Sequence, residues 1–254
     1  MHIINYFIKM RKFIIAIISI FSIICVSCQK QTNDSQKDHK KVWLHRANTI
    51  EKAQYFQDKY AGLEIDITYL DSLHTFIVFH GGGLAEPEPV RLEQWFEEVG
   101  NANKLKLWLD FKNLSNNNKM QALTELNHLC KKYNISKNNI IVENWNAKDL
   151  SVFQENGYQT SYYIPDFNPQ KASKFDIQKH TYKIRKAISS YNITTISGYH
   201  YQYQFMRDSF PDQNVLIWYI GDNKKVQEEY IQLANQDDKV KVLLIAEEIP
   251  ENKK

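Results

Sequence analysis

The chain has 254 residues, of which 43% are hydrophobic, 13% aromatic and 24% charged, and its formal net charge is +3. This composition is that of a globular protein and excludes collagen-like, low-complexity and wholly disordered chains. Three cysteines are too few for a disulfide framework.

Residues 1–27 are predicted to be a signal peptide. A basic start with Lys9, Arg11 and Lys12 precedes an unbroken apolar run, Phe13 to Ile24. That run would rise only about 18 Å as a helix, which is short for a membrane span. Removing the segment takes away three Lys/Arg and no acid, so the formal charge falls from +3 to zero. We therefore expect no nucleic-acid partner.

The end of this segment, Cys25-Val26-Ser27-Cys28, resembles the bacterial lipoprotein signal, in which a cysteine after a small residue is acylated. The resemblance implies lipidation of Cys28, a polar tether over 28–40, and a lipid-anchored protein in the bacterial cell envelope, outside the cytoplasm. Cys25 stands where that signal usually has Leu, so an ordinary cleaved signal or an uncleaved anchor stays open. The remaining cysteine, Cys130, lies on an apolar helix face and is predicted to pack in the core.

From Lys41 onward, short apolar strands alternate with segments whose apolar residues have helical spacing. The predicted strands are Val42–Asn48, Leu63–Tyr69 with Phe76–His80, Leu105–Phe111, Ile140–Trp145, Gln159–Ile164, Thr194–Tyr199, Val215–Ile220 and Val240–Ala246. The predicted helices are Ile50–Tyr60, Arg91–Val99, Lys119–Tyr133, Ala147–Asn156, Ile177–Ser190, Tyr203–Phe210 and Lys224–Ala234.

This order of elements predicts an α/β protein, a single-domain (β/α)8 TIM barrel over residues 41–250. The count of eight strands requires that Phe76–His80 extend the second strand. An open doubly wound sheet is the alternative, but it would need a glycine-rich turn after its first strand, where His45–Asn48 stand.

Polar residues occur where several strands end, which is the end of a barrel that carries chemistry. They are His45, Arg46, Asn48, Glu64, Asp66, His80, Asp110 and Lys112. Residues i and i+2 of a strand point to one face, so Glu64 projects with Asp66, and Asp110 with Lys112. Glu143 and Asn144, at the end of the fourth strand, and His200, after the sixth, are interpreted as surface or rim polarity, with contact to substrate as the alternative.

If both pairs face the barrel axis, three carboxylates converge near the mouth, and they need a cation to stay ionised together. Oxygen ligands without thiolates favour Mg²⁺ or Ca²⁺ over zinc. Glu64, Asp66 and Asp110 are therefore predicted to be metal ligands. The alternative is that Glu64 and Asp66 face solvent while their apolar neighbours face inward.

Together these motifs resemble the glycerophosphodiester phosphodiesterase family. The resemblance rests on Leu44-His45-Arg46, Asn48-Thr49, Gly62-Leu63-Glu64-Ile65-Asp66, Val78-Phe79-His80, Asp110-Phe111-Lys112, Trp218-Tyr219-Ile220 and Glu247-Glu248-Ile249-Pro250. That family shares a barrel superfamily with sphingomyelinase D and phosphatidylinositol-specific phospholipase C. It implies that His45 and His80 are acid/base catalysts, that Lys112 holds the phosphate and developing charge, and that Trp218 walls the pocket.

Several features depart from the family pattern. Only Ala47 separates His45-Arg46 from Asn48-Thr49, Gly81 follows His80 where Asp is usual, and residues 81–103 are too few for the usual insertion domain. The compact first motif and the Asp-x-Lys are closer to sphingomyelinase D and to the menorin proteins, and Leu92–Phe96 is menorin-like.

The sequence thus predicts a metal-dependent phosphodiesterase that cleaves glycerophosphodiesters or phospholipid headgroups by two-histidine acid/base catalysis. We assign His45 as base and His80 as acid, and expect Arg46, Asn48 and Trp218 to contact substrate. Its partners would be a phosphodiester or lipid headgroup, and a membrane reached through the N-terminal anchor. The alternative is a non-catalytic barrel lipoprotein that binds a sugar-phosphate or a protein partner.

Overall fold

The structure is a computed structural model that describes residues 40–81 and 88–253. The predicted signal peptide, the lipidation of Cys28 and the tether before Lys40 lie outside the described residues. None of the described helices is both long and apolar enough to cross a bilayer. The chain from Lys41 onward forms one compact unit.

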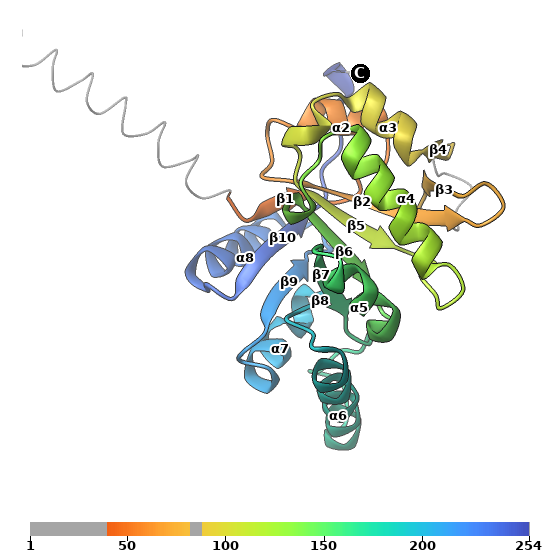
Figure 1. Ribbon diagram of the computed structural model, residues 1–254. Coiled ribbons are helices and arrows are strands. Elements are labelled where there is room, and N and C mark those ends of the chain that lie inside the picture. Colours follow the sequence, from red (N-terminus) through yellow and green to blue (C-terminus); the bar gives the residue numbers. More distant parts are fainter. Residues whose placement is uncertain (1–39, 82–87, 254) are drawn as a thin grey trace, which may run out of the picture. The chain divides into compact units, whose positions relative to one another are not determined.

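In the described part, eight parallel strands close into a barrel (Figure 1). They are β1 (Val42–Leu44), β2 (Leu63–Leu70), β5 (Leu107–Phe111), β6 (Ile140–Asn144), β7 (Gln159–Tyr163), β8 (Thr195–Tyr199), β9 (Asn214–Trp218) and β10 (Val240–Ile245). Each strand pairs with the next around the ring, and β1 pairs with both β10 and β2. The predicted TIM barrel is confirmed, and the open doubly wound sheet is excluded.

The barrel closes through a sparse seam between β1 and β2. The two strands share a single register pair, Leu44 with Leu63. Backbone hydrogen bonds at the seam join Leu44 N to Gly62 O at 3.0 Å and Ala47 N to Glu64 O at 2.8 Å. The first motif therefore lies directly against the start of β2, which carries the first two carboxylates.

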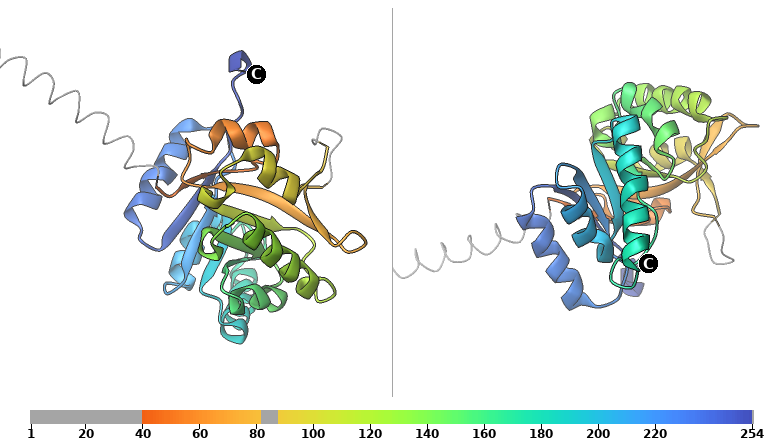
Figure 2. Two further views of the ribbon diagram at one scale, coloured as in Figure 1. Left: turned by 45° about the horizontal axis from the view of Figure 1, so that its top comes forward. Right: turned by 90° about the horizontal axis from the view of Figure 1, so that it is seen from below.

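Helices surround the barrel (Figure 2). They are α2 (Ile50–Phe56), α3 (Leu92–Val99), α4 (Lys119–Lys132), α5 (Ala147–Glu155), α6 (Lys174–Tyr191), α7 (Tyr203–Ser209) and α8 (Lys224–Gln236). Short polar side chains cap several of them: Thr49, Ser173 and Asn223 accept hydrogen bonds from the first turns of α2, α6 and α8. Such caps satisfy amide groups that have no partner within a helix.

Apolar side chains form two separate cores. Inside the barrel, Trp43, Trp108 and Leu216 pack with Trp218 and with aliphatic residues from β6 and β10. A larger core between strands and helices includes Ile65, Leu109 and Cys130, the last as predicted. Because strand side chains alternate between the two faces, the residues on either side of Ile65 must point into the barrel.

Phe76–His80 does not extend the second strand, and that part of the prediction is wrong. Residues Thr75–Val78 form β3, which runs antiparallel to β2 after a tight turn at Asp71–His74, and a short β4 (Val90–Arg91) pairs with β3. His74 turns the chain with a positive φ of 48°. The hairpin projects from the barrel and returns to it, where Phe79 N donates to Asp66 O at 3.0 Å (Figure 1).

Candidate active site

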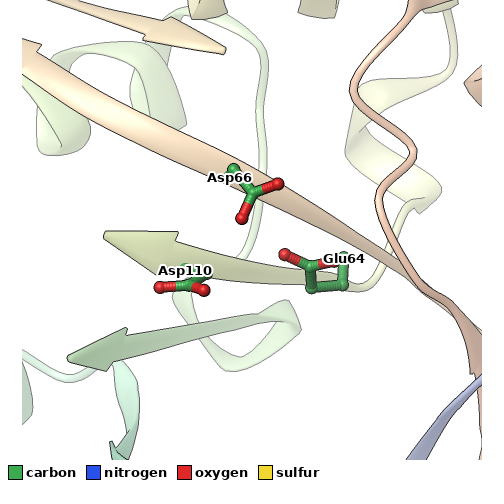
Figure 3. A group of neighbouring side chains, drawn as sticks. All are labelled: Glu64, Asp66 and Asp110. Atoms are coloured by element: carbon green, nitrogen blue, oxygen red, sulfur yellow. The ribbon is translucent and has the colours of Figure 1, made fainter. Parts of the chain in front are cut away.

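Three carboxylates meet inside the barrel, two from the first half of β2 and one from the end of β5 (Figure 3). Asp66 and Asp110 are register partners on these strands, and Glu64 lies two residues before Asp66 on the same face. One oxygen from each carboxylate lies within 4.8 Å of the others. Glu64 is 2% exposed and Asp66 1% exposed, which excludes the alternative that they face solvent.

Lys112 supplies the main positive charge to this group. Its Nζ lies 2.6 Å from Asp66 Oδ1 and also donates to Asp110. Burial alone would lower the pKa of Lys112, but the two carboxylates raise it above its ordinary value, so the side chain stays charged. For Asp66, burial raises the pKa, but the charge of Lys112 and the hydrogen bond from Asn48 outweigh it and bring the pKa of Asp66 below its ordinary value.

Glu64 has less compensation. Burial and the charges of Asp66 and Asp110 raise the pKa of Glu64 well above its ordinary value, against one hydrogen bond from Arg46 N at 2.7 Å. Burial and Asp66 also raise the pKa of Asp110, although Lys112 opposes them. The cluster is thus short of positive charge, which is the condition under which a cation binds carboxylates.

The two predicted histidines line the same small cavity as the carboxylates. His45 follows β1, its backbone N–H donates to Ile245 O at 2.9 Å, and its Nε2 lies 3.8 Å from Glu64 Oε2. Burial, with the Arg46 charge, lowers the pKa of His45 to about 3. The imidazole of His45 is therefore neutral near pH 7 and able to accept a proton.

Arg46 joins the second histidine to the acidic cluster. Its Nη2 donates to His80 Nε2 at 2.8 Å, and its Nε lies 3.9 Å from Asp66 Oδ2. The backbone of Arg46 has a φ of 55°, a left-handed conformation that costs a non-glycine residue about 1–2 kcal/mol. Such strain is concentrated at functional sites, where the surrounding structure holds it in place.

Asn48 is placed against a carboxylate rather than against His45. Its Nδ2 donates to Asp66 Oδ2 at 2.7 Å, and its Oδ1 accepts from Asp66 N at 2.9 Å. Asn48 is not among the described residues that line the cavity. The structure thus makes it a residue that orients Asp66, while its predicted contact with substrate stays a prediction.

The cavity has a volume of about 140 Å³ and an aromatic wall opposite the motif residues. Trp218, at the end of β9, packs on Tyr163 with ring centroids 4.3 Å apart and on Tyr199 at 5.2 Å. The placement of Trp218 agrees with the pocket-wall role that the resemblance implies. Tyr163 was not singled out from the sequence, although its position at the end of a strand is a usable signal.

Glu143 also lines the cavity, so its interpretation as rim polarity is wrong. It is 1% exposed and pairs in register with Asp110. One oxygen accepts from Ser197 Oγ, while Oε2 makes no hydrogen bond. Burial and the charge of Asp110 raise the pKa of Glu143 well above its ordinary value. Asn144 is buried as well, whereas His200 lies outside the cavity lining.

Comparison with solved structures identifies proteins with the same architecture. The chain is similar to a glycerophosphodiester phosphodiesterase from Parabacteroides distasonis, with a TM-score of 0.58 and 14% identity over 81% of this chain and 92% of that one. It is also similar to an Oleispira antarctica phosphodiesterase in complex with the product sn-glycerol-3-phosphate, with a TM-score of 0.55 and 11% identity over 81% and 92%. The chain has the fold of the glycerophosphodiester phosphodiesterases.

No family model matches the sequence, and no curated protein matches it. At this level of identity the likeness concerns the fold, while function must be argued from the site itself. The resemblance read from the motifs is confirmed in that sense, and most of its polar residues line one cavity of a barrel of this fold, whereas Asn48 and Glu247–Pro250 do not.

Proposed function

We propose that the protein is a metal-dependent phosphodiesterase that cleaves glycerophosphodiesters or phospholipid headgroups. The observation that carries the proposal is that four carboxylates, one lysine, one arginine and two histidines line a single cavity. The similar phosphodiesterase that contains sn-glycerol-3-phosphate supports this substrate class.

The carboxylate group fits a divalent cation. All three donors are oxygens, their ligand atoms lie within 4.8 Å of one another, and burial together with the charges of Asp66 and Asp110 raises the pKa of Glu64. Glu64, Asp66 and Asp110 would hold Mg²⁺ or Ca²⁺, which prefer such ligands. When bound, the ion would act as a Lewis acid on a phosphate oxygen.

The residues of the chain supply the remaining steps. Lys112 and Arg46 place positive charge beside the phosphate, and Arg46 can bind two of its oxygens. His45, which is neutral, takes the proton of the attacking hydroxyl as that oxygen bonds to phosphorus. His80 gives a proton to the leaving oxygen as its bond to phosphorus breaks. For this, Arg46 turns from His80 Nε2 to the phosphate.

Two further parts of the proposal concern position. Trp218 forms the wall against which the substrate lies, and Asn48 holds Asp66 in the orientation that faces the cavity. The expected acylation of Cys28 would hold the enzyme on the membrane of the bacterial envelope, on the extracytoplasmic side. A reporter of Cys28 acylation, such as labelling by a palmitate analogue, tests this part separately.

The full-length chain in detergent, incubated with glycerophosphocholine, lysophospholipids and sphingomyelin, tests the activity. We expect turnover that requires Mg²⁺ or Ca²⁺ and that His45→Ala abolishes, while His128→Ala, which alters an exposed histidine on α4, keeps it. Binding of these compounds without turnover would instead support the alternative, a barrel that binds a sugar-phosphate or a partner. Equal loss in both variants would contradict the assignment of His45.

A further inference from the structure

Large apolar side chains are exposed on one end of the barrel. In the described residues, six are strongly exposed, and five of these lie on segments that directly follow strands: Leu73, Met120, Trp145, Phe175 and Ile220. We call these five the mouth ring. Their exposed fractions lie between 51% and 73%. The sixth, Tyr182, lies in the middle of α6.

The topology places the mouth ring at the catalytic end. Strands of a parallel barrel all run toward the same end, so the connections after them, and the first turns of the helices, gather there. Trp145 follows β6, Ile220 follows β9, Met120 and Phe175 begin α4 and α6, and Leu73 caps the hairpin that projects beyond this end (Figure 1). None of the described segments that lead from helices into strands carries such a side chain.

Single exposed hydrophobic residues are common on protein surfaces, but five on separate connections around one opening are not a random distribution. Ile220 joins the ring to the cavity, because it is half-exposed and also lines the cavity with His45 and Lys112. We propose that the mouth ring docks on a phospholipid bilayer, so that the substrate is a lipid headgroup presented at the membrane surface. The inference rests on the proposed function and narrows its substrate class.

A bilayer fits this surface better than a second copy of the chain. A partner protein seated on the ring would cover the opening beside Ile220, which lines the cavity, whereas a lipid would enter the cavity from the membrane side. Tryptophan and phenylalanine are also the residues that settle at the boundary between lipid headgroups and acyl chains. The reacting phosphodiester would then lie above the membrane while the tails stay in it.

The chain before the barrel is long enough for this orientation. The strand β1 begins at Val42, at the end opposite the mouth ring. Residues 29–40 can span at most about 40 Å when fully extended. The eight residues of β2, the longest strand of the barrel, rise only about 26 Å. A chain held at Cys28 can therefore turn its mouth toward the membrane that anchors it.

Tryptophan fluorescence tests the docking directly. Trp145 is the exposed one of five tryptophans, since Trp43, Trp95, Trp108 and Trp218 are buried. The full-length chain is reconstituted in phosphatidylcholine vesicles with and without brominated acyl chains. We expect the brominated lipids to quench the Trp145 emission, measured as the difference between the chain and Trp145→Phe.

A matched pair of variants locates the contact. Phe175→Ser is expected to shift the ratio of docked to undocked barrels about tenfold or more toward the undocked form. Tyr182→Ser removes a side chain of similar exposure on the same helix, away from the ring, and should leave the quenching unchanged. Equal melting temperatures of the two variants show that both are folded.

The outcomes separate this inference from the proposed function. Quenching, with turnover of vesicle phospholipid that Phe175→Ser lowers, supports both. Quenching without any turnover supports the docking and contradicts the phosphodiesterase. Turnover of soluble glycerophosphocholine with an unquenched Trp145 overturns the docking alone. A lipid-free dimer that Trp145→Ser dissociates would overturn it too, because a second copy would then cover the ring.

Discussion

The two ends of the barrel differ in the residues that adopt a left-handed backbone. Where helices lead into strands, positive φ angles occur at Gly100, Asn101, Asn134, Gly157 and Asn192. Glycine and asparagine adopt this conformation at little steric cost, so these turns carry little backbone strain. On the mouth side, Gly81 and Gly221 also have positive φ angles, but so do two residues that tolerate them less well: His74, in the hairpin turn, and Arg46, whose guanidinium contacts His80.

The ends also differ in polarity and packing. The mouth buries three carboxylates, those of Glu64, Asp66 and Glu143, beside the half-buried Asp110 and one lysine, and it exposes the apolar mouth ring. Each feature costs stability, because buried charges and exposed apolar groups both oppose folding. The opposite end has ordinary turns and helix C-termini, such as the one at Asn192. The barrel thus separates a stabilising end from an end where stability is given up for chemistry.

Glu64→Gln should have the largest effect of the three variants, because it should lower the activity and raise the stability. We expect turnover to fall about 100-fold or more, because an amide is a poorer ligand than a carboxylate for the cation that Glu64, Asp66 and Asp110 would hold. The melting temperature of the metal-free protein should rise, since the amide ends the repulsion with Asp66 and Asp110. Glu155→Gln, at the far end of α5, is the control and should change neither. A lower melting temperature with full activity would refute the comparison.

The raised pKa of Glu143 should make the free energy of unfolding depend on pH. Its pKa is raised in the folded chain, so the folded state holds a proton that the unfolded state releases, and stability falls as pH rises above the ordinary pKa. Urea unfolding of metal-free protein between about pH 5 and about pH 8 should be less pH-dependent in Glu143→Gln, by up to about 1.4 kcal/mol per pH unit. Parallel curves for the two proteins would exclude this.

Asn192→Ala should have the smallest effect, and on stability alone. Asn192 ends α6 with a φ of 51°, and its backbone N–H donates to Ile188 O. Alanine in this conformation should cost about 1 kcal/mol in the free energy of unfolding, measured by urea. Asn192→Gly, which has no Cβ, should lose much less, and both variants should keep full turnover. A loss of turnover in Asn192→Ala would contradict the view that this end of the barrel affects stability alone.

The sequence was sufficient to predict those features of the structure that depend on the spacing of residues within one element. The two i, i+2 pairs, Glu64 with Asp66 and Asp110 with Lys112, fixed their common face without knowledge of the neighbours. The alternation of strands and helices fixed the barrel. The direction of β3 could not be read this way, because an apolar run after a turn is compatible with either an extension or a hairpin.

Glu143 was missed for a different reason. Its place in the cavity follows from register, since it lies beside Asp110 on β6 and opposite Ser197, and register joins residues far apart in the sequence. The strand Ile140–Asn144 has two adjacent polar residues, Glu143 and Asn144, which point to opposite faces and so do not reveal which side of the strand is inside. The aromatic wall of Tyr163, Tyr199 and Trp218 likewise needed three strands to be placed together.

The seam between β1 and β2, with a single register pair, is the place where this barrel can most easily widen. His45 follows β1 and Glu64 lies on β2, so any widening of this seam would move His45, the proposed base, away from Glu64. Thr49 starts the next helix only two residues beyond Ala47, which leaves little slack to absorb such a movement. The short link between Ala47 and α2 therefore holds the β1–β2 seam closed. Lengthening this link should loosen the end of the barrel that carries the candidate site and leave the rest of the barrel unchanged.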